Sequence, residues 1–254
     1  MAFDVAADAY DRFMGVWSRP LASAFADFAG IEPGMRALDV GSGPGSLTAE
    51  LVARLGATNV ASVDPSEPFV AAVAARYPGV DVRRGAAEAL PHPDATFDAA
   101  LAQLVVHFMT DPVSGLREMA RVTRPGCVVA ACVWDYGGGR GPLGPFWEAA
   151  RELDPEAVDE SLLSGARAGH LEELAVAAGL EGIHGGELAV SRDVDGFDAW
   201  WEPFTRGVGP AGAYLAGLDA RRTAALRDRC RAALPPGPFT LTGVAWAVRG
   251  AVPT

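Results

Sequence analysis

The most informative segment of the chain reads Ala37-Leu-Asp-Val-Gly-Ser-Gly-Pro-Gly-Ser-Leu-Thr48. An apolar run that predicts a β-strand leads into three glycines, Gly41, Gly43 and Gly45, and then into a segment with helical spacing. Glycine permits positive φ and lets a ligand approach the main chain, and the start of a helix offers unpaired N–H donors. The segment therefore predicts a strand, loop and helix that hold a nucleoside cofactor.

Two acidic residues narrow the choice of cofactor. A dinucleotide-binding loop would have glycine where Ser46 stands, which disfavours a dinucleotide. Asp39, at the end of the predicted strand, suits a cofactor that carries an ammonium group better than one that carries a pyrophosphate. Asp64 ends the next predicted strand, where an acid can accept both ribose hydroxyls. Together they favour S-adenosylmethionine. The alternative is that both acids only cap loops and the glycines only form a turn.

Strand and helix patterns alternate around this segment, which indicates βαβ units and a parallel sheet covered on both faces. The predicted strands span residues 36–40, 59–64, 80–84, 97–103 and 127–134, and the predicted helices span residues 46–55, 68–76 and 112–123. Farther along, residues 170–179 predict a helix, and residues 182–191 and 239–248 predict two more strands. Two mainly helical segments interrupt this second half.

Composition limits the size, location and partners of the protein. Its 254 residues, 50% of them apolar, can bury the core of one domain. The 21 basic residues against 32 acidic ones leave a net charge of −11, which would repel a nucleic acid. Cys127, Cys132 and Cys230 show neither metal-ligand spacing nor a disulfide framework, so no metal site is expected. Without a secretory leader or a membrane-spanning run, we expect a cytoplasmic protein that does not bind a membrane.

Further segments resemble motifs of the class I S-adenosylmethionine-dependent methyltransferases, as the glycine loop itself does. Gly85-Ala-Ala-Glu-Ala-Leu-Pro-His-Pro-Asp94, followed by Phe97-Asp98, resembles the adenine-contacting loop of that family. Residues 104–112 resemble the segment after its fourth strand, and residues 117–133, with Arg124-Pro-Gly126 as the turn, resemble its next helix and fifth strand. The likeness runs from residue 37 to residue 134 and is to the broad small-molecule (type 11/25) subfamily.

The resemblance implies a fold and a division of the chain. The fold is α/β and Rossmann-like, with a seven-stranded, mostly parallel sheet whose last hairpin is antiparallel, plus helical lid insertions. Residues 1–254 would form a single domain. Its expected parts are an N-terminal helical lid (1–30), a cofactor-binding half (31–135) and helical substrate-cap insertions (136–168 and 192–236).

The resemblance also implies which residues bind S-adenosylmethionine. The expected contacts are Asp39, Gly41, Ser42, Gly43, Gly45, Asp64, Pro65, Ala86, Ala87, Glu88 and Gln103. Relatives often have aspartate at the position of Ala86, so adenine would rely here on the backbone near Ala87, on Glu88 or on a water. In similar methyltransferases an N-terminal helix closes over the methionine end of the cofactor. The candidates on that helix are Tyr10, Trp17 and Arg19, and ordinary packing of an apolar helix is the alternative.

His107 is the first candidate for a catalytic base. It follows the fourth predicted strand, and an imidazole can take a proton from a hydroxyl or amine near neutral pH. A structural role is the alternative. Asp135 is a second polar candidate, and His92, His170 and His184 have weaker claims. Aromatic residues in the two helical segments either line a chamber for an apolar or aromatic acceptor or form the core of a cap; they are Trp147, Trp200, Trp201, Phe204 and Tyr214.

The expected function is S-adenosylmethionine-dependent methyl transfer to an oxygen, nitrogen or carbon of a small, apolar or aromatic metabolite, by a monomer or homodimer. Nucleobase amino-methylation is disfavoured, because Gln103-Leu-Val-Val106 stands where Asn or Asp followed by Pro-Pro-aromatic would be expected. One alternative is a protein that binds S-adenosylmethionine without methyl transfer, as a sensor, scaffold or cyclase. A nicotinamide-dependent oxidoreductase is a less favoured one.

Overall fold

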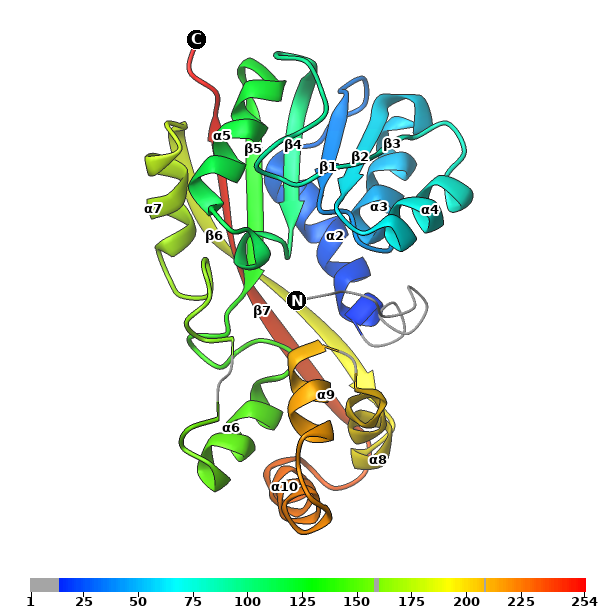
Figure 1. The fold of residues 1–254 in the computed structure, drawn as a ribbon, viewed down its shortest axis with the longest axis vertical. Helices are drawn as coiled ribbons and strands as arrows, with labels where there is room; N and C mark the ends of the chain where they lie inside the picture. Colours follow the sequence, from blue (N-terminus) through cyan, green and yellow to red (C-terminus); the bar gives the residue numbers. More distant parts are fainter. Residues whose placement is uncertain (1–13, 158–159, 208) are drawn as a thin grey trace.

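One sheet of seven strands, in the order β3-β2-β1-β4-β5-β7-β6, organises the computed structural model, which describes residues 14–157, 160–207 and 209–254 (Figure 1). The strands are β1 (Ala37–Val40), β2 (Val60–Asp64), β3 (Asp81–Arg84), β4 (Phe97–Gln103), β5 (Thr123–Trp134), β6 (Glu181–Val194) and β7 (Phe239–Ala251). Strands β1 to β5 run parallel, and β7 pairs antiparallel with β5 and with β6. The expected α/β fold with an antiparallel last hairpin is confirmed.

Apolar side chains alternate between the two faces of the sheet and build a core on each. On β4, Leu101 joins the core under α2 (Val16–Ala29) and α3 (Ser46–Leu55). Its neighbours Ala100 and Ala102 join the opposite core, under α5 (Pro112–Val122) and α7 (His170–Ala177). The helix α4 (Glu67–Arg76) packs against β2 and β3. This burial on both faces follows from the two-residue period of a strand and explains why the central strands β1, β2 and β4 are mostly apolar.

The order of the strands places one strand end in a favourable position for a ligand. From β1 the chain passes to β2 and β3 on one side and then returns to β4 on the other side of β1. The carboxyl end of β1 therefore lies at a topological switch point. In open α/β sheets, ligands bind in the crevice at such a point.

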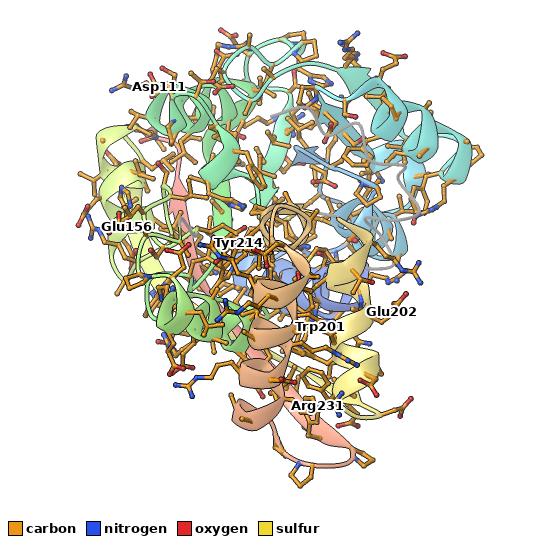
Figure 2. All side chains as sticks on the ribbon, turned by 60° about the horizontal axis from the view of Figure 1, so that its bottom comes forward. Asp111, Glu156, Trp201, Glu202, Tyr214 and Arg231 are labelled. Atoms are coloured by element: carbon orange, nitrogen blue, oxygen red, sulfur yellow. The ribbon has the colours of Figure 1, made fainter. Side chains whose placement is uncertain are left out.

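A helical cap lies beyond the carboxyl ends of the parallel strands, where β6 and β7 continue past the rest of the sheet (Figure 1). The cap contains α6 (Gly144–Leu153), α8 (Phe197–Trp201), a 3₁₀ helix (Glu202–Arg206), α9 (Gly209–Ala216) and α10 (Ala220–Ala233). In Figure 2, Trp201 lies among these helices, while Glu202 and Arg231 are at the surface. The cap thus has an apolar interior, which is continuous with the core under α2 and α3.

Aromatic rings form that interior. Phe146 stacks on Phe204 with 4.6 Å between ring centroids, and Trp200 meets Phe204 edge to face at 4.9 Å. Trp200, Trp201 and Phe204 are all buried. They form the core of the cap, which is the second of the two roles expected for them.

Two segments differ from the sequence-based expectation. The predicted turn Arg124-Pro-Gly126 lies within β5, where the pairing with β4 shifts: Phe97 is opposite Thr123, but Ala99 is opposite Val128. Strand β6 is longer than predicted because residues 192–194 pair with β7 beyond the rest of the sheet, and β7 is longer because residues 249–251 pair with β5. Among the described residues, no helix combines the length and apolarity needed to cross a bilayer.

Candidate functional site

The loop after β1 requires glycine for two different reasons. Gly41 has φ +69°, and a Cβ on it would lie 2.5 Å from Cγ1 of Val105, which follows β4. Gly43 has φ +52° and open space around it, so its constraint is the backbone conformation alone. The N–H groups of Gly41 and Ser42 donate to the carbonyl of Val63, at 2.7 and 3.1 Å. The loop is therefore held close to β2 and to the segment after β4.

Asp39, on β1, is a buried carboxylate with one side-chain donor. It is 1% exposed, and its Oδ2 accepts a hydrogen bond of 2.6 Å from the Thr48 hydroxyl on α3. Burial raises the pKa of Asp39 to about 7, and the nearby Asp64 carboxylate adds to this rise, against the opposing hydrogen bond from Thr48. A cation placed beside Asp39 would restore its ionised form.

Asp64, at the end of β2, organises the same loop from the other side. Its Oδ2 accepts a 2.8 Å hydrogen bond from the Gly43 N–H, and its Oδ1 accepts one of 2.8 Å from the Ser66 N–H. Burial raises the pKa of Asp64, and these two N–H donors oppose the rise. Each carboxylate oxygen still has a lone pair, so the side chain can accept further hydrogen bonds from two vicinal hydroxyls.

These residues line one cleft of about 820 Å³, open solvent included. Seven of the expected cofactor contacts lie in its wall: Asp39, Gly41, Ser42, Gly43, Asp64, Pro65 and Gln103. Within the described residues, Oγ of Ser42 and Oε1 of Gln103 are buried without a hydrogen-bond partner. Buried polar atoms are normally satisfied, so these two atoms indicate where a polar ligand would bind.

Comparisons with known proteins agree with this geometry. Residues 38–131 match a family model described as a methyltransferase domain. In sequence these residues are similar to S-adenosylmethionine-dependent methyltransferases. The resemblance seen in the sequence is therefore confirmed.

Two relatives show how far the sequence likeness extends. A probable S-adenosylmethionine-dependent methyltransferase of Mycolicibacterium smegmatis is 37% identical over 133 residues, which cover 51% of this chain and 50% of that protein. A demethylmenaquinone methyltransferase of Beutenbergia cavernae is 37% identical over 128 residues, which cover 49% of this chain and 52% of that protein. The chain spans about half the length of the curated relatives it matches.

The fold likeness extends over almost the whole chain. Haemonchus contortus phosphoethanolamine N-methyltransferase 2, solved in complex with S-adenosyl-L-methionine, has a TM-score of 0.59 at 17% identity, over 98% of this chain and 57% of that one.

Several residues in the cleft of the methyltransferase domain were not expected from the sequence. They are Gly15, Ser18, Pro44, Ser46, Leu47, Ser66, Phe69, Leu104, Val105 and Phe108. Ser66 and Phe69 closely follow Asp64, so the signal that identified Asp64 could have extended to them. Ser18 comes from α2, and its carbonyl accepts a 2.9 Å hydrogen bond from Nε2 of Gln103. Nothing in the local pattern of α2 marks that contact.

Other expected contacts lie outside the lining of the cleft. Gly45 packs near Val73 and Tyr77, and Ala87 is buried in the core beneath α5. Ala86 is exposed. The carboxylate of Glu88 instead accepts hydrogen bonds from the N–H groups of Thr110 and Asp111, at 2.7 and 3.3 Å. Glu88 thus ties its loop to the segment before α5.

The three N-terminal candidates have different outcomes. Trp17 is 5% exposed and belongs to the core that α2 forms with the sheet, so the packing alternative holds for it. Arg19 is exposed on α2 and does not line the cleft. Tyr10 lies outside the described residues. The helix does reach the cleft, through Gly15 and Ser18.

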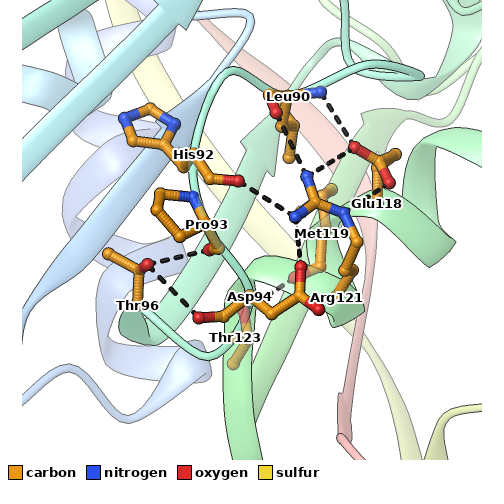
Figure 3. A network of polar contacts seen from close by, with 9 residues as sticks. All are labelled: Leu90, His92, Pro93, Asp94, Thr96, Glu118, Met119, Arg121 and Thr123. Carbon is orange, nitrogen blue, oxygen red and sulfur yellow. Dashed lines mark hydrogen bonds and ion pairs between the residues drawn. The ribbon is translucent and has the colours of Figure 1, made fainter.

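The loop over residues 85–94 is held against α5 by one arginine (Figure 3). Arg121 donates to the carbonyls of Leu90 and His92, at 3.1 and 3.0 Å, and pairs with the carboxylate of Asp94 at 2.6 Å. It also pairs with Glu118, whose Oε2 accepts from the Leu90 N–H at 3.0 Å. The network fixes the loop that the sequence predicts to lie beside adenine.

His107 lines a second, smaller cavity that shares Leu104 and Phe108 with the cofactor cleft. Burial lowers its pKa to about 3, and its Nδ1 is buried without a hydrogen-bond partner among the described residues. An imidazole with so low a pKa is neutral at physiological pH and is a weak base. It remains able to form one hydrogen bond with a bound molecule.

The alternatives to His107 are engaged in structure. The buried carboxylate of Asp135 accepts from Gly138 N–H at 2.8 Å, from Trp246 Nε1 at 2.9 Å and from Arg140 Nε at 2.5 Å. His92 meets Phe97 edge to face at 5.0 Å between ring centroids. Nδ1 of His170 accepts from the Gly165 N–H, and His184 stacks on Phe28. In the described part of the chain, no group of three or more acidic, histidine or cysteine side chains could hold a metal.

Proposed function

We propose that the protein binds S-adenosylmethionine in the cleft at the end of β1 and transfers its methyl group to an oxygen, nitrogen or carbon of a small apolar or aromatic metabolite. The observation that carries the proposal is the pair of buried carboxylates, Asp39 and Asp64, on either side of the glycine loop. Asp39 would hold the ammonium group, and Asp64 would accept the ribose hydroxyls. The unpartnered atoms of Ser42 and Gln103 add polar contacts within the same cleft.

When bound, S-adenosylmethionine supplies an electrophilic methyl group on a sulfonium. The chain itself contributes binding, orientation and exclusion of water, which account for much of the acceleration of such transfers. Leu104 and Phe108 line both the cleft and the second cavity and form the apolar wall between them. We propose that the helical segments 136–168 and 192–236 form the substrate cap and that His107 contacts the acceptor from the second cavity.

The acceptor is proposed to be a small molecule. The net charge of −11 argues against a nucleic acid. The relative from Beutenbergia cavernae is named for a demethylmenaquinone substrate, which agrees with an apolar, aromatic acceptor. We further propose a cytoplasmic protein that acts as a monomer or homodimer.

Transfer is tested by incubating the protein with S-adenosylmethionine labelled on its methyl group and with a small-molecule extract of the host cell. We expect label in a small organic product and stoichiometric formation of S-adenosylhomocysteine. Binding without either product would instead assign the protein to the sensors, scaffolds or cyclases. A larger rise in melting temperature with NADH than with S-adenosylhomocysteine would favour the oxidoreductase alternative.

A further inference from the structure

The second cavity has an unusual combination of groups in its wall. It spans about 410 Å³, open solvent included, between the end of the sheet and the cap. Most of its lining is apolar, with Met14, Leu104, Phe108 and Leu143 among the contributors. Four side chains with polar atoms share that wall, namely Trp134, Tyr136, His107 and Glu160. A cavity of this kind, mostly apolar with a few polar groups, is typical of small-molecule sites.

Two of these polar side chains have unsatisfied atoms. Nε1 of Trp134 and Nδ1 of His107 are both buried without a hydrogen-bond partner among the described residues. An indole N–H can only donate, so an acceptor atom on a molecule in the cavity would satisfy Trp134. A donor buried without a partner is unfavourable, and a correctly placed ligand atom would satisfy it.

Glu160 brings a buried carboxylate to the same wall. Glu160 is 4% exposed, and its Oε2 accepts a 3.2 Å hydrogen bond from Nε1 of Trp147 on α6. A carboxylate accepts several hydrogen bonds at once, so Glu160 can also receive an O–H or N–H from a ligand. Glu160 lies in the cap rather than in residues 38–131, which the family model covers.

The wall shared with the cofactor cleft is itself strained. Leu104 has φ +60°, one of two positive values among the described residues other than glycine. Its N–H donates to the carbonyl of Cys132 at 2.8 Å, which helps to hold this conformation. Strained residues of this kind cluster at functional sites. Leu104 and Phe108 line both cavities, so a molecule in the second cavity would lie directly beside the cofactor cleft.

We infer that the second cavity binds the methyl acceptor, as a small ring compound bearing a hydroxyl or amino group that donates to Glu160 and accepts from Trp134. The inference rests on the proposed function, since it names the acceptor class of that reaction. Glu160 is here a positioning and specificity residue. Its carboxylate accepts a hydrogen bond from the proton on the nucleophilic atom and so fixes the position of that atom. A hydroxyl and a neutral amine share this donor and acceptor chemistry, and the test separates them.

The test uses three bicyclic probes of equal shape: indan-5-ol, 5-aminoindane and 5-methylindane, which lacks the polar group. Calorimetry measures their binding to the full chain, with and without saturating S-adenosylhomocysteine. We expect the hydroxyl or the amino probe, or both, to bind about tenfold more tightly than the methyl probe. Glu160→Gln should weaken that preference, because an amide oxygen accepts less strongly than a carboxylate, and should leave the affinity for 5-methylindane unchanged. Glu148→Gln, at an exposed position of α6, is the matched control and should change nothing.

A second variant keeps the test decisive if Glu160→Gln folds poorly. Pro210, half-buried in α9, lines the cavity, and Pro210→Trp should fill it and abolish binding of every probe. S-adenosylhomocysteine binding should persist in that variant. Equal affinity for the three probes, binding unaffected by Glu160→Gln, or no probe binding to protein that does bind S-adenosylhomocysteine would each overturn the inference. Failure to bind S-adenosylhomocysteine would instead overturn the proposed function.

Discussion

At the scale of single residues, the cleft places carboxylates where water cannot stabilise their charge. Asp39 is buried and has a pKa of about 7, although Thr48 donates to it. The folded protein therefore holds a proton on Asp39 that the unfolded chain would release. The contribution of protonated Asp39 to the stability of the fold is complete at low pH and is lost as the pH rises toward 7. A bound ammonium group would instead favour the ionised carboxylate. Burial of Asp39 therefore lowers the stability of the free protein and serves to bind a cation.

The pH dependence of cofactor binding should follow the ionisation of the Asp39 carboxyl group. Only the ionised carboxylate attracts an ammonium group, so affinity for S-adenosylhomocysteine should fall as the pH drops below about 7, by at most tenfold per unit. Calorimetry between pH 5.5 and 8 measures this slope. Asp39→Asn should bind at least tenfold more weakly, lose the slope and melt at a higher temperature than the parent at pH 8. A parent protein with pH-independent affinity would contradict this assignment.

His107 should affect turnover more than cofactor binding. Its imidazole lines the second cavity rather than the cofactor cleft, so His107→Ala should leave affinity for S-adenosylhomocysteine within about twofold and slow methyl transfer about tenfold or more. The pKa of about 3 keeps His107 neutral, so we expect no step from it in the rate profile between pH 5 and 8. Kinetics with the acceptor found by the labelling assay provide the check. Unchanged turnover would assign His107 to structure.

At the scale of elements, two contacts hold the cleft in shape. The loop after β1 touches the segment after β4, where Gly41 leaves no room for a Cβ beside Val105. The loop over residues 85–94 is fixed to α5 through Arg121. Each contact joins a loop to an element far away in the sequence. Both are therefore expected to couple local geometry to cofactor affinity.

Gly41→Ala should lower both stability and cofactor affinity, because the new methyl group would overlap Val105. Overpacking of this kind costs about 1–3 kcal/mol, in addition to the strain of a positive φ. Gly34→Ala is a matched control, since Gly34 also has a positive φ but nothing within 4 Å of an added Cβ. Denaturant unfolding should show a larger loss for Gly41→Ala, and Val105→Ala should restore part of it. Equal losses at the two glycines would refute the close contact.

Replacing Arg121 with methionine should free the loop over residues 85–94 while leaving α5 intact. The change removes two ion pairs and two carbonyl contacts, so we expect a stability loss of about 1–2 kcal/mol. The Leu90 amide, which donates to Glu118, should exchange its hydrogen faster. Arg117→Met on the same helix is the control, because Arg117 contacts the carbonyl of Ala177 instead. An unchanged exchange rate at the Leu90 amide would show that the loop keeps its conformation without Arg121.

At the scale of the whole molecule, the sequence predicted the parallel half better than the cap. Asp39, the glycine loop and Asp64 occupy consecutive strand ends, so a local pattern was sufficient to identify them. Trp17 could not be assigned, since core packing and a lid contact require the same helical spacing. Phe108 and Ser18 enter the cleft through tertiary contacts that leave no local signal. The aromatic residues of the cap likewise revealed their mutual packing only in three dimensions.

The central claim is that the cleft between Asp39 and Asp64 binds a sulfonium nucleoside, and titration calorimetry of the full chain with S-adenosylmethionine and S-adenosylhomocysteine tests it most directly. The account predicts saturable binding of both compounds at one site per chain, with loss of at least tenfold in affinity for Asp39→Asn. NADH should give no saturable heat. Absence of binding by both sulfur compounds, in protein that melts cooperatively, would contradict the claim.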